Sequence, residues 1–137
     1  MKNVIQNKEA TISILKVLMN EIRNGILCTS TVKNSLQNVQ VVHTTEMDRY
    51  GNLFFIFSSD SKHYHNLQTN KEIKLIYTIP DRSELLMIIG TAETSSNIST
   101  IERYWSPYNT KDFDKGKTDP TIRVLIIVIE YSKILKS

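Results

Sequence analysis

The hydrophobic pattern of the chain changes its period once, near Gly25, and this change limits the fold more than any other feature. Before it, residues 8–24 carry apolar side chains at spacings of three and four, from Ile12 to Ile22, as on one face of an amphipathic helix. Gly25 is expected to end this helix at its C′ position. After it, apolar residues occur in short β-branched runs separated by turn-forming residues. The sequence therefore predicts one N-terminal helix followed by a mainly β domain.

The β-rich part divides into runs that we predict to be strands. They are residues 26–32, 36–45, 53–58, 72–79, 84–94 and 121–129, the last continuing toward residue 135. Short helices are expected over residues 60–69, closing at Asn70, and from the capping residues 95–97 to Trp105. The tight turns favour an antiparallel α+β barrel or sandwich over a parallel βαβ array. With no internal repeat, the 137 residues are expected to form a single domain, residues 1–137.

Composition narrows the class of protein further. The 17 Lys and Arg outnumber the 14 Asp and Glu, but the basic residues are dispersed, and Lys111 and Lys115 are interleaved with Asp112 and Asp114. Nucleic acid binding needs a continuous basic patch, so no nucleic-acid partner is expected. No apolar run approaches the roughly 20 residues of a membrane span, and the N-terminus lacks a signal-peptide pattern. With Cys28 as the single cysteine, a cytoplasmic setting is the expectation.

The common catalytic motifs are absent from the sequence. It contains no glycine-rich nucleotide loop and no G-x-S-x-G motif. His63 and His65 have the spacing of a metal-binding pair, but no third ligand accompanies them, so no metal is predicted. Cys28 lies in an apolar run and is interpreted as a core residue rather than a nucleophile. No pair of residues is arranged as general acid and base, and we therefore assign no catalytic side chain.

The segment from Phe55 to His63 carries the most informative functional pattern. It runs from an apolar strand through hydroxyl-bearing residues into the start of a helix, where Ser61 and Lys62 follow one another. A helix N-terminus offers free N–H groups and partial positive charge to an anion, and a lysine and a hydroxyl strengthen such a site. Spacing alone leaves two readings open. The segment binds a phosphate, or Ser59 or Asp60 merely caps the helix while Lys62 is solvated.

Several short motifs follow one another along the chain. They are Asp48-x-x-Gly51-Asn52-Leu53-Phe54-Phe55, Ser58-Ser59-Asp60-Ser61-Lys62-His63, Gly90-Thr91-Ala92-Glu93, Glu102-x-x-Trp105-x-Pro107 and Gly116-Lys117-Thr118-Asp119-Pro120. Together they resemble the pyridoxamine 5′-phosphate oxidase-like superfamily of FMN-binding split barrels, in particular its general stress protein 26 branch. No single motif is specific, but their order and spacing are. The resemblance covers about residues 25–129.

The resemblance implies a homodimer of six-stranded antiparallel split barrels with peripheral short helices, and FMN in a composite cleft between the subunits. The positions matched to FMN contacts are the phosphate-binding pair Lys62 and His63 with Ser58 and Ser61 beside it, the strand residues Val41, Val42, His43 and Thr44 along the isoalloxazine ring, and Phe57. Trp105 belongs to an aromatic cluster for which two interpretations stay open. The cluster walls the flavin pocket across the dimer interface, or it plugs one end of the barrel.

The chain departs from the family pattern at two positions that bear on flavin affinity. Relatives usually carry an arginine for the phosphate where this chain has Val39, and a threonine where it has Phe57. Each lost hydrogen bond is typically worth about 0.5–3 kcal/mol, so FMN binding is expected to be weaker than in those relatives. If the Val39 side chain were packed in the core, the match between Val39 and the phosphate-binding arginine of the relatives would have to be abandoned.

We therefore predict a small cytoplasmic FMN-binding flavoprotein of oxidoreductase type, with flavin and NAD(P)H as its small-molecule partners. A true pyridoxamine 5′-phosphate oxidase is not expected, because no C-terminal substrate-binding extension is identifiable. Two alternatives stay open: a non-catalytic module that stores or senses flavin, and a dimeric protein that has lost tight cofactor binding. Dimerisation is expected to bury residues 53–57 and 124–129, which are too apolar for solvated faces.

Overall fold

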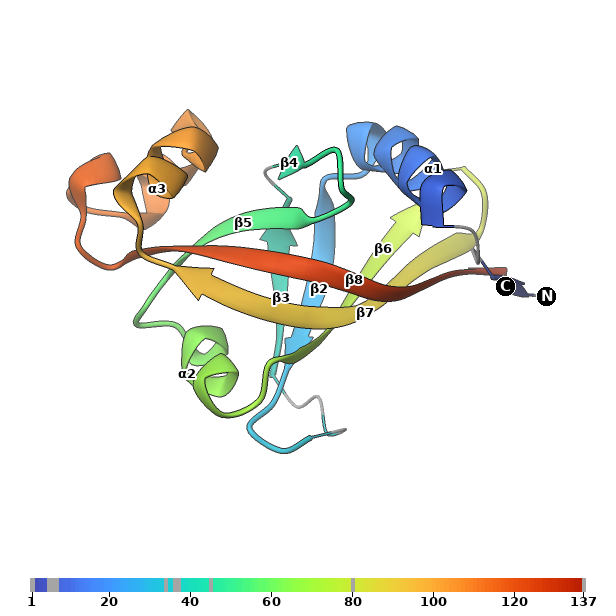
Figure 1. Cartoon of the computed structure of the whole chain (residues 1–137), viewed down its shortest axis with the longest axis horizontal. Helices are drawn as coiled ribbons and strands as arrows, with labels where there is room; N and C mark the ends of the chain where they lie inside the picture. Colours follow the sequence, from blue (N-terminus) through green and yellow to red (C-terminus); the bar gives the residue numbers. More distant parts are fainter. Residues whose placement is uncertain are drawn as a thin grey trace.

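The computed structural model describes residues 2–4, 8–33, 35, 38–44, 46–79 and 81–136. Helices cover the margins of a sheet in this part of the chain (Figure 1). The helices are α1 (Lys8–Glu21), α2 (Lys62–Thr69) and α3 (Ile98–Tyr104), with the 3-10 segments η1 (Pro107–Asp112) and η2 (Gly116–Thr118). The strands are β1 (Lys2–Val4), β2 (Asn24–Thr29), β3 (Asn38–His43), β4 (Glu46–Met47), β5 (Leu53–Ser58), β6 (Glu72–Ile79), β7 (Glu84–Ser95) and β8 (Ile122–Lys136).

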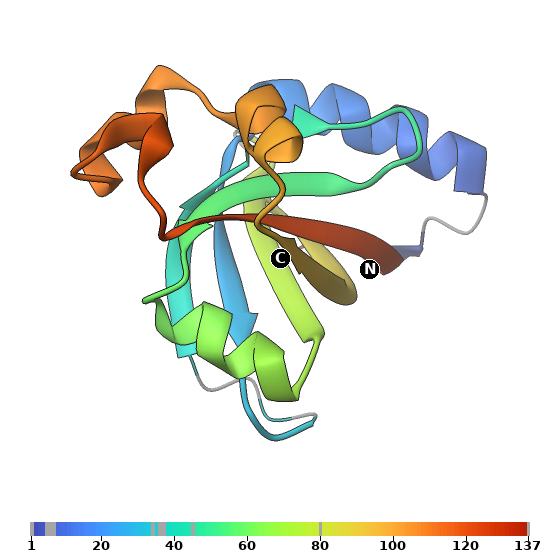
Figure 2. The same cartoon turned by 60° about the vertical axis from the view of Figure 1, so that its left-hand side comes forward.

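All strands of the described residues belong to one curled antiparallel sheet. Its order is β3-β2-β6-β7-β8-β5-β4, and β1 pairs with β8 outside this path. Figure 2 shows the sheet bent into a half-barrel, with α1 above it and α2 below it in that view. The predicted α+β, mainly β split barrel is confirmed. The described sheet has eight strands instead of the predicted six, because β1 and β4 are too short to give a periodic signal.

Side-chain caps fix the start of the two short helices. The Ser61 hydroxyl accepts a hydrogen bond from the Tyr64 N–H at 3.1 Å, and the Asn97 side chain accepts one from the Thr100 N–H at 3.1 Å. Each bond satisfies a donor that has no partner within the first turn of a helix. The predicted helices over residues 60–69 and 97–105 are thereby confirmed to within two residues.

Gly25 has a different role from the predicted one. Helix α1 ends at Glu21, and Gly25 lies within β2. A Cβ atom at this position would lie 2.5 Å from Cε1 of Tyr77. The glycine therefore lets the Tyr77 ring pack directly on the backbone of β2, and the prediction that it ends the helix was wrong.

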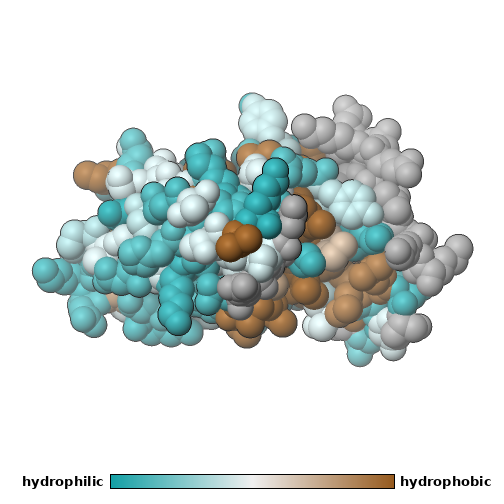
Figure 3. Space-filling view, turned by 90° about the horizontal axis from the view of Figure 1, so that it is seen from below, coloured by the Kyte–Doolittle hydropathy of each residue, from teal (hydrophilic) through white to brown (hydrophobic). Residues whose placement is uncertain are grey.

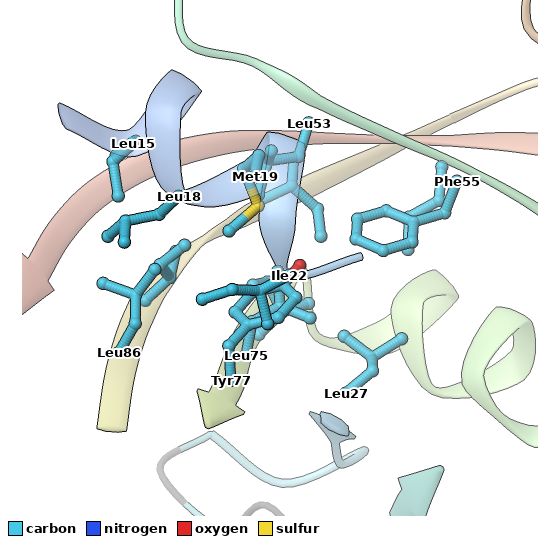
Figure 4. Close-up of a cluster of buried hydrophobic side chains, with 14 of the residues drawn as sticks. Leu15, Leu18, Met19, Ile22, Leu27, Leu53, Phe55, Leu75, Tyr77 and Leu86 are labelled. Carbon is cyan, nitrogen blue, oxygen red and sulfur yellow. The ribbon is translucent and has the colours of Figure 1, made fainter. Parts of the chain in front are cut away.

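The core fills the concave side of the sheet, and α1 closes it (Figure 4). The helix contributes Leu15, Leu18, Met19 and Ile22, and the sheet contributes among others Leu27, Leu53, Phe55, Leu75, Tyr77 and Leu86. A second buried cluster packs α3 and the following segment against β5 and β8. It comprises Phe54, Ile101, Tyr104, Phe113, Ile122 and Val124. These two clusters cover β5 and β8 from both sides.

This double coverage corrects one prediction. Residues 53–57 and 124–129 were assigned to a dimer face because of their apolar character. Leu53 and Ile127 are instead fully buried in the main core, and Phe54 and Val124 are buried in the second cluster. Their apolar character is explained by burial within one chain, so it gives no reason to expect a partner there.

Exposed and half-buried apolar side chains do remain, on the convex side of β3, β2, β6 and β7. Val41, Ile26, Ile76 and Met87 stand opposite one another in the register of these strands and therefore share one face of the sheet. Val39, two residues before Val41, joins them. Val39 and Val41 are 65% and 69% exposed. We call these five residues the outer apolar face. Figure 3 shows that apolar surface is concentrated toward one end of the molecule when it is seen from below.

Candidate functional site

A pocket lies between β3 and β5, two strands that are not paired with each other in the curled sheet. Its volume is about 180 Å³. It is lined by Leu27, Gln40, Val41, Val42, His43, Phe55, Ile56, Phe57, His63, Tyr108, Asn109, Lys111, Asp112 and Leu125. We call it the β3–β5 pocket. Of the ten residues predicted to contact a cofactor, it brings together Val41, Val42, His43, Phe57 and His63.

The β3 wall of this pocket offers backbone groups as well as side chains. Strand β3 stands first in the strand order and pairs only with β2 in the described sheet. An edge strand leaves alternate N–H and C=O groups without a strand partner. A planar ligand with its own donors and acceptors can therefore bind along β3 much as another strand would.

His63 is held at the base of the pocket by a buried hydrogen-bond network. Its Nδ1 lies 2.6 Å from the Thr29 hydroxyl, and that hydroxyl accepts a bond from Asn66 Nδ2 at 2.9 Å. Asn66 Nδ2 also donates to Asn38 Oδ1 at 2.7 Å. The network ties β2, the start of β3 and α2 together. It fixes the position of a ring that is only 4% exposed.

Burial sets the charge of His63. The Thr29 hydroxyl and His63 Nδ1 share a hydrogen bond, and in the tautomer in which Nδ1 accepts the Thr29 proton the ring proton is on Nε2. Burial lowers the pKa of His63, so the ring is neutral at pH 7. The resemblance matched His63 to a basic phosphate-binding pair. In this chain the side chain is neutral instead, because burial disfavours the charged form of the ring.

A second histidine forms the opposite end of the lining. The His43 ring stacks on Tyr108 with 4.1 Å between ring centroids, and Lys111 Nζ lies 4.2 Å from the Tyr108 centroid. His43 Nδ1 is 3.0 Å from Asn24 Oδ1, so Nδ1 carries the proton. Burial, with nearby Arg23 and Lys111, lowers the pKa of His43. The neutral ring therefore offers an unprotonated Nε2.

The other predicted phosphate-binding residues, Ser58, Ser61 and Lys62, lie outside the lining, at the start of α2. Ser58 Oγ accepts a hydrogen bond from Asp60 N at 3.0 Å, and Ser61 Oγ caps the helix. Lys62 is exposed and makes no ion pair within the described residues. The N-cap is therefore Ser61, and the prediction that Ser59 or Asp60 caps the helix was wrong. An exposed Lys62 agrees with both readings of that residue, because a solvated lysine is also available to an anion.

Thr44 and Trp105 were also predicted to contact the cofactor, but their side chains contact other residues of the chain. Thr44 is 1% exposed and its hydroxyl lies 2.7 Å from the Tyr77 hydroxyl. Burial raises the pKa of Tyr77 to about 12, so Tyr77 stays protonated in this pair. Trp105 packs on Phe113, with 5.6 Å between ring centroids, beside the second buried cluster. Neither residue reaches the β3–β5 pocket, and within one chain Trp105 fits the barrel-plug interpretation of the aromatic cluster.

Val39 is not a core residue. Its side chain is 65% exposed on the outer apolar face, which removes the interpretation that the family's arginine position has been repacked as core. Cys28, in contrast, is buried, and burial raises the pKa of its thiol. It is a packing residue, as predicted.

Of the η1 side of the pocket, the sequence pointed only to Tyr108, as a member of the aromatic cluster that includes Trp105 and has a pocket wall as one of its two interpretations. Asn109, Lys111 and Asp112 were missed, because they come from a segment with little periodicity. The available signal was local. Ser106 is followed three residues later by Asn109, and the two form a capping box in which Asn109 Oδ1 accepts from Ser106 N at 3.0 Å.

None of the helices in the described residues is long and apolar enough to cross a membrane. His, Cys, Asp and Glu side chains form no group of three or more suited to a metal ion in the same residues.

Comparison with known proteins identifies a matching family model and several solved structures with a similar fold. A family model described as pyridoxamine 5′-phosphate oxidase like matches residues 10–135. No curated protein matches the sequence. Among solved structures, a protein from Clostridium acetobutylicum related to general stress protein 26 of B. subtilis has a TM-score of 0.77 and 16% identity, covering 95% of this chain and 91% of its own.

Two other solved structures are similar. General Stress Protein 26 from Bacillus anthracis str. Sterne has a TM-score of 0.75 and 13% identity, with 93% of this chain and 98% of that chain covered. The general stress FMN/FAD binding protein from Xanthomonas citri has a TM-score of 0.70 and 20% identity, with 94% and 87% covered. At these identities the likeness shows a common fold.

Proposed function

This chain belongs to the pyridoxamine 5′-phosphate oxidase-like family, and from that premise we propose that it is an FMN-binding flavoprotein of oxidoreductase type. One observation carries the proposal. Five residues matched to flavin contacts by their sequence context come from three separate elements, β3, β5 and α2, and line the same pocket. A similar structure is described as an FMN/FAD binding protein, which supports a flavin as the ligand.

The two neutral histidines suit the polar edge of a flavin ring. The isoalloxazine carries both hydrogen-bond acceptors and a donor. The pocket offers the unprotonated Nε2 of His43 and, in the tautomer in which Thr29 donates to Nδ1, the Nε2–H of His63. The edge of β3 adds backbone groups of both kinds. Phe57 and Phe55 supply apolar contact area on the other wall. These groups bind and orient the ring and exclude water from one side of it.

The phosphate of FMN is assigned to the start of α2. Ser61 caps the helix through Tyr64 N, so the N–H groups of Lys62 and His63 are left as the first-turn donors. The ammonium group of Lys62 adds a full charge. With Val39 in place of an arginine, Lys62 is the main cation of the proposed phosphate site, and moderate rather than tight FMN binding is expected.

The pocket of one chain is too small for a whole flavin. Its 180 Å³ is below the roughly 300 Å³ at which small-molecule sites begin. Val41 lines this pocket and also belongs to the outer apolar face. A second copy packed on that face by a two-fold axis would extend the pocket into a composite cleft. We therefore propose a homodimer in which each flavin is bound by both subunits.

The flavin supplies the electron and hydride chemistry when it is bound, and NAD(P)H is the proposed donor. The side chains of this chain need only position the ring and limit its contact with water. His43 and His63 are both neutral in this account, and no step is assigned to either as an acid or base.

Reconstitution with FMN tests the proposal. We expect the protein to retain a visible flavin absorbance band after desalting, and NADH or NADPH to bleach that band under anaerobic conditions. A retained band that neither nucleotide bleaches would identify a flavin store or sensor instead of an oxidoreductase. Protein that emerges colourless, with all FMN in the small-molecule fraction, would contradict flavin binding itself.

A further inference from the structure

The side of α2 that faces the sheet is polar at two of its three buried positions. His63, Asn66 and Leu67 are the buried residues of this helix, and of these only Leu67 belongs to the main apolar cluster. A helix on the surface of a sheet normally packs through an apolar stripe. Buried polar side chains cost free energy unless they are hydrogen-bonded. The position of α2 on the sheet therefore depends on hydrogen bonds as well as on apolar packing.

Thr29, the last residue of β2, is where these hydrogen bonds meet. Its hydroxyl lies 2.6 Å from His63 Nδ1 and accepts a bond from Asn66 Nδ2 at 2.9 Å. The Thr29 side chain is 0% exposed. It does not line the β3–β5 pocket, so it can affect a ligand bound there only through other residues. One hydroxyl thus connects β2 to two positions of α2 that are one turn apart.

The two sides of the proposed flavin site are held in different ways. Strand β3 pairs with β2 over its whole length, so the edge that is proposed to bind the ring does not need α2. The other two groups lie on α2: His63 lines the pocket, and Lys62 is the proposed phosphate cation. The Tyr64 ring packs on Phe57 and lies under the Arg123 guanidinium. These ring contacts join α2 to β5 and β8, whereas the Thr29 hydroxyl joins it to the strand that carries β3.

From this arrangement we propose that Thr29 is a positioning residue of the flavin site and acts through α2. The inference rests on the proposed function. The Thr29 hydroxyl holds α2 against the end of β2 and so sets where Lys62 and His63 stand relative to the edge of β3. A flavin whose ring lies along β3 then meets the groups of α2 already in place. Such preorganisation raises affinity because the ligand does not have to order the helix itself.

The change Thr29→Val tests the inference, because it removes the hydroxyl and keeps a β-branched side chain of similar shape. FMN and riboflavin are titrated separately, and flavin fluorescence is followed. FMN uses both groups of α2, whereas riboflavin has no phosphate and gains nothing from Lys62. We expect Thr29→Val to bind FMN about tenfold more weakly and to lose less affinity for riboflavin, so that the ratio of the two affinities falls. A general loss of stability would lower both affinities by the same factor and leave the ratio unchanged.

Two further variants separate the hydroxyl from the packing around it. Thr29→Ser keeps the hydroxyl and should restore the ratio of the parent chain. Ser30→Ala is the matched control. Ser30 is equally buried, but its hydroxyl accepts a bond from Val32 N at 3.1 Å, within its own segment, and its removal should not change the ratio.

A double variant links Thr29 to the phosphate. Lys62→Ala should weaken FMN less in the Thr29→Val background than in the parent chain, because Lys62 is already displaced there. Asn66→Ala removes one of the two bonds from the helix side and should shift the ratio in the same direction. It keeps the test available if Thr29→Val does not fold.

The inference is overturned if Thr29→Val or Asn66→Ala keeps the ratio of the parent chain, or if Thr29→Ser loses as much as Thr29→Val. It is also overturned if Lys62→Ala has the same effect in both backgrounds. All of these results leave flavin binding by the parent chain intact, and the proposed function with it. A parent chain that binds no FMN overturns the proposed function itself, and this inference together with it.

Discussion

His63 shows how a single buried hydrogen bond changes the chemistry of a residue. Read from the sequence, it is one of two adjacent basic residues at the start of a helix. In the fold, Thr29 lies 2.6 Å from its Nδ1 and the ring is almost fully buried. That partner is 34 residues away in the sequence, so no local pattern identifies it. The residue thus contributes a neutral imidazole to the pocket rather than a positive charge.

A pH dependence of stability follows from this burial. The pKa of His63 in the folded chain is lowered below its ordinary value near 6.5. Below pH 6.5 the unfolded chain therefore binds more protons than the folded one, and the free energy of unfolding decreases as the pH falls. We expect the melting temperature to drop between pH 7 and pH 5.5, and to drop less in His63→Gln. His65→Gln, on the exposed side of the same helix, is the control, and an equal slope in His63→Gln and the parent chain would contradict the account.

Lys62 carries the phosphate half of the proposed flavin site. Lys62→Ala removes a charge-assisted contact, typically about 1.5–3 kcal/mol, and should weaken FMN about ten- to a hundredfold. Riboflavin, which has no phosphate, should bind the variant as it binds the parent. Lys115→Ala, another exposed lysine, serves as control. If FMN and riboflavin lose affinity equally, Lys62 is only a solvated helix residue.

At the scale of elements, the sequence predicted the regular parts well. Strands β5 and β6 have the bounds expected from their apolar runs, and the cap Asn97 lies among the capping residues predicted for α3. The cap of α2 is Ser61 instead of the predicted Ser59 or Asp60. Strands β1 and β4 were missed because two or three residues carry no period. Asn109, Lys111 and Asp112 of the η1 wall were missed for the same reason, whereas Tyr108 belonged to the aromatic cluster considered as a pocket wall. The position of the η1 wall depends on contacts such as the stacking of Tyr108 on His43, which join distant segments.

The antiparallel pairing of β7 with β8 is irregular at one point, and this irregularity leads to a prediction about stability. The register shifts between Ile89 and Gly90, and a Cβ on Gly90 would overlap the Val128 carbonyl oxygen. Because that atom belongs to the backbone of a central strand, it cannot move freely. Gly90→Ala is expected to lower the free energy of unfolding by about 1–3 kcal/mol in chemical denaturation. Thr91→Ala is the control in the same strand, and equal midpoints for all three proteins would show that the strands relax without cost.

For the whole molecule, the outer apolar face is the surface on which the proposed dimer depends. Val41→Asp introduces a charge at its most exposed side chain and should give a single-chain mass by light scattering, together with loss of FMN binding. Val17→Asp is the matched control, because Val17 is 62% exposed on α1, which carries none of the face. A parent chain that already scatters as a monomer would contradict the composite cleft, whatever the variants do.

The proposed function depends above all on flavin binding at the β3–β5 pocket. The most direct measurement is a titration of FMN with the apo chain, followed by the fluorescence of the flavin. Since each of the two symmetric clefts takes one ring, we predict a saturable fluorescence change that reaches its end point at one FMN per chain. A linear response without saturation, equal to that of FMN mixed with an unrelated protein, would contradict the claim.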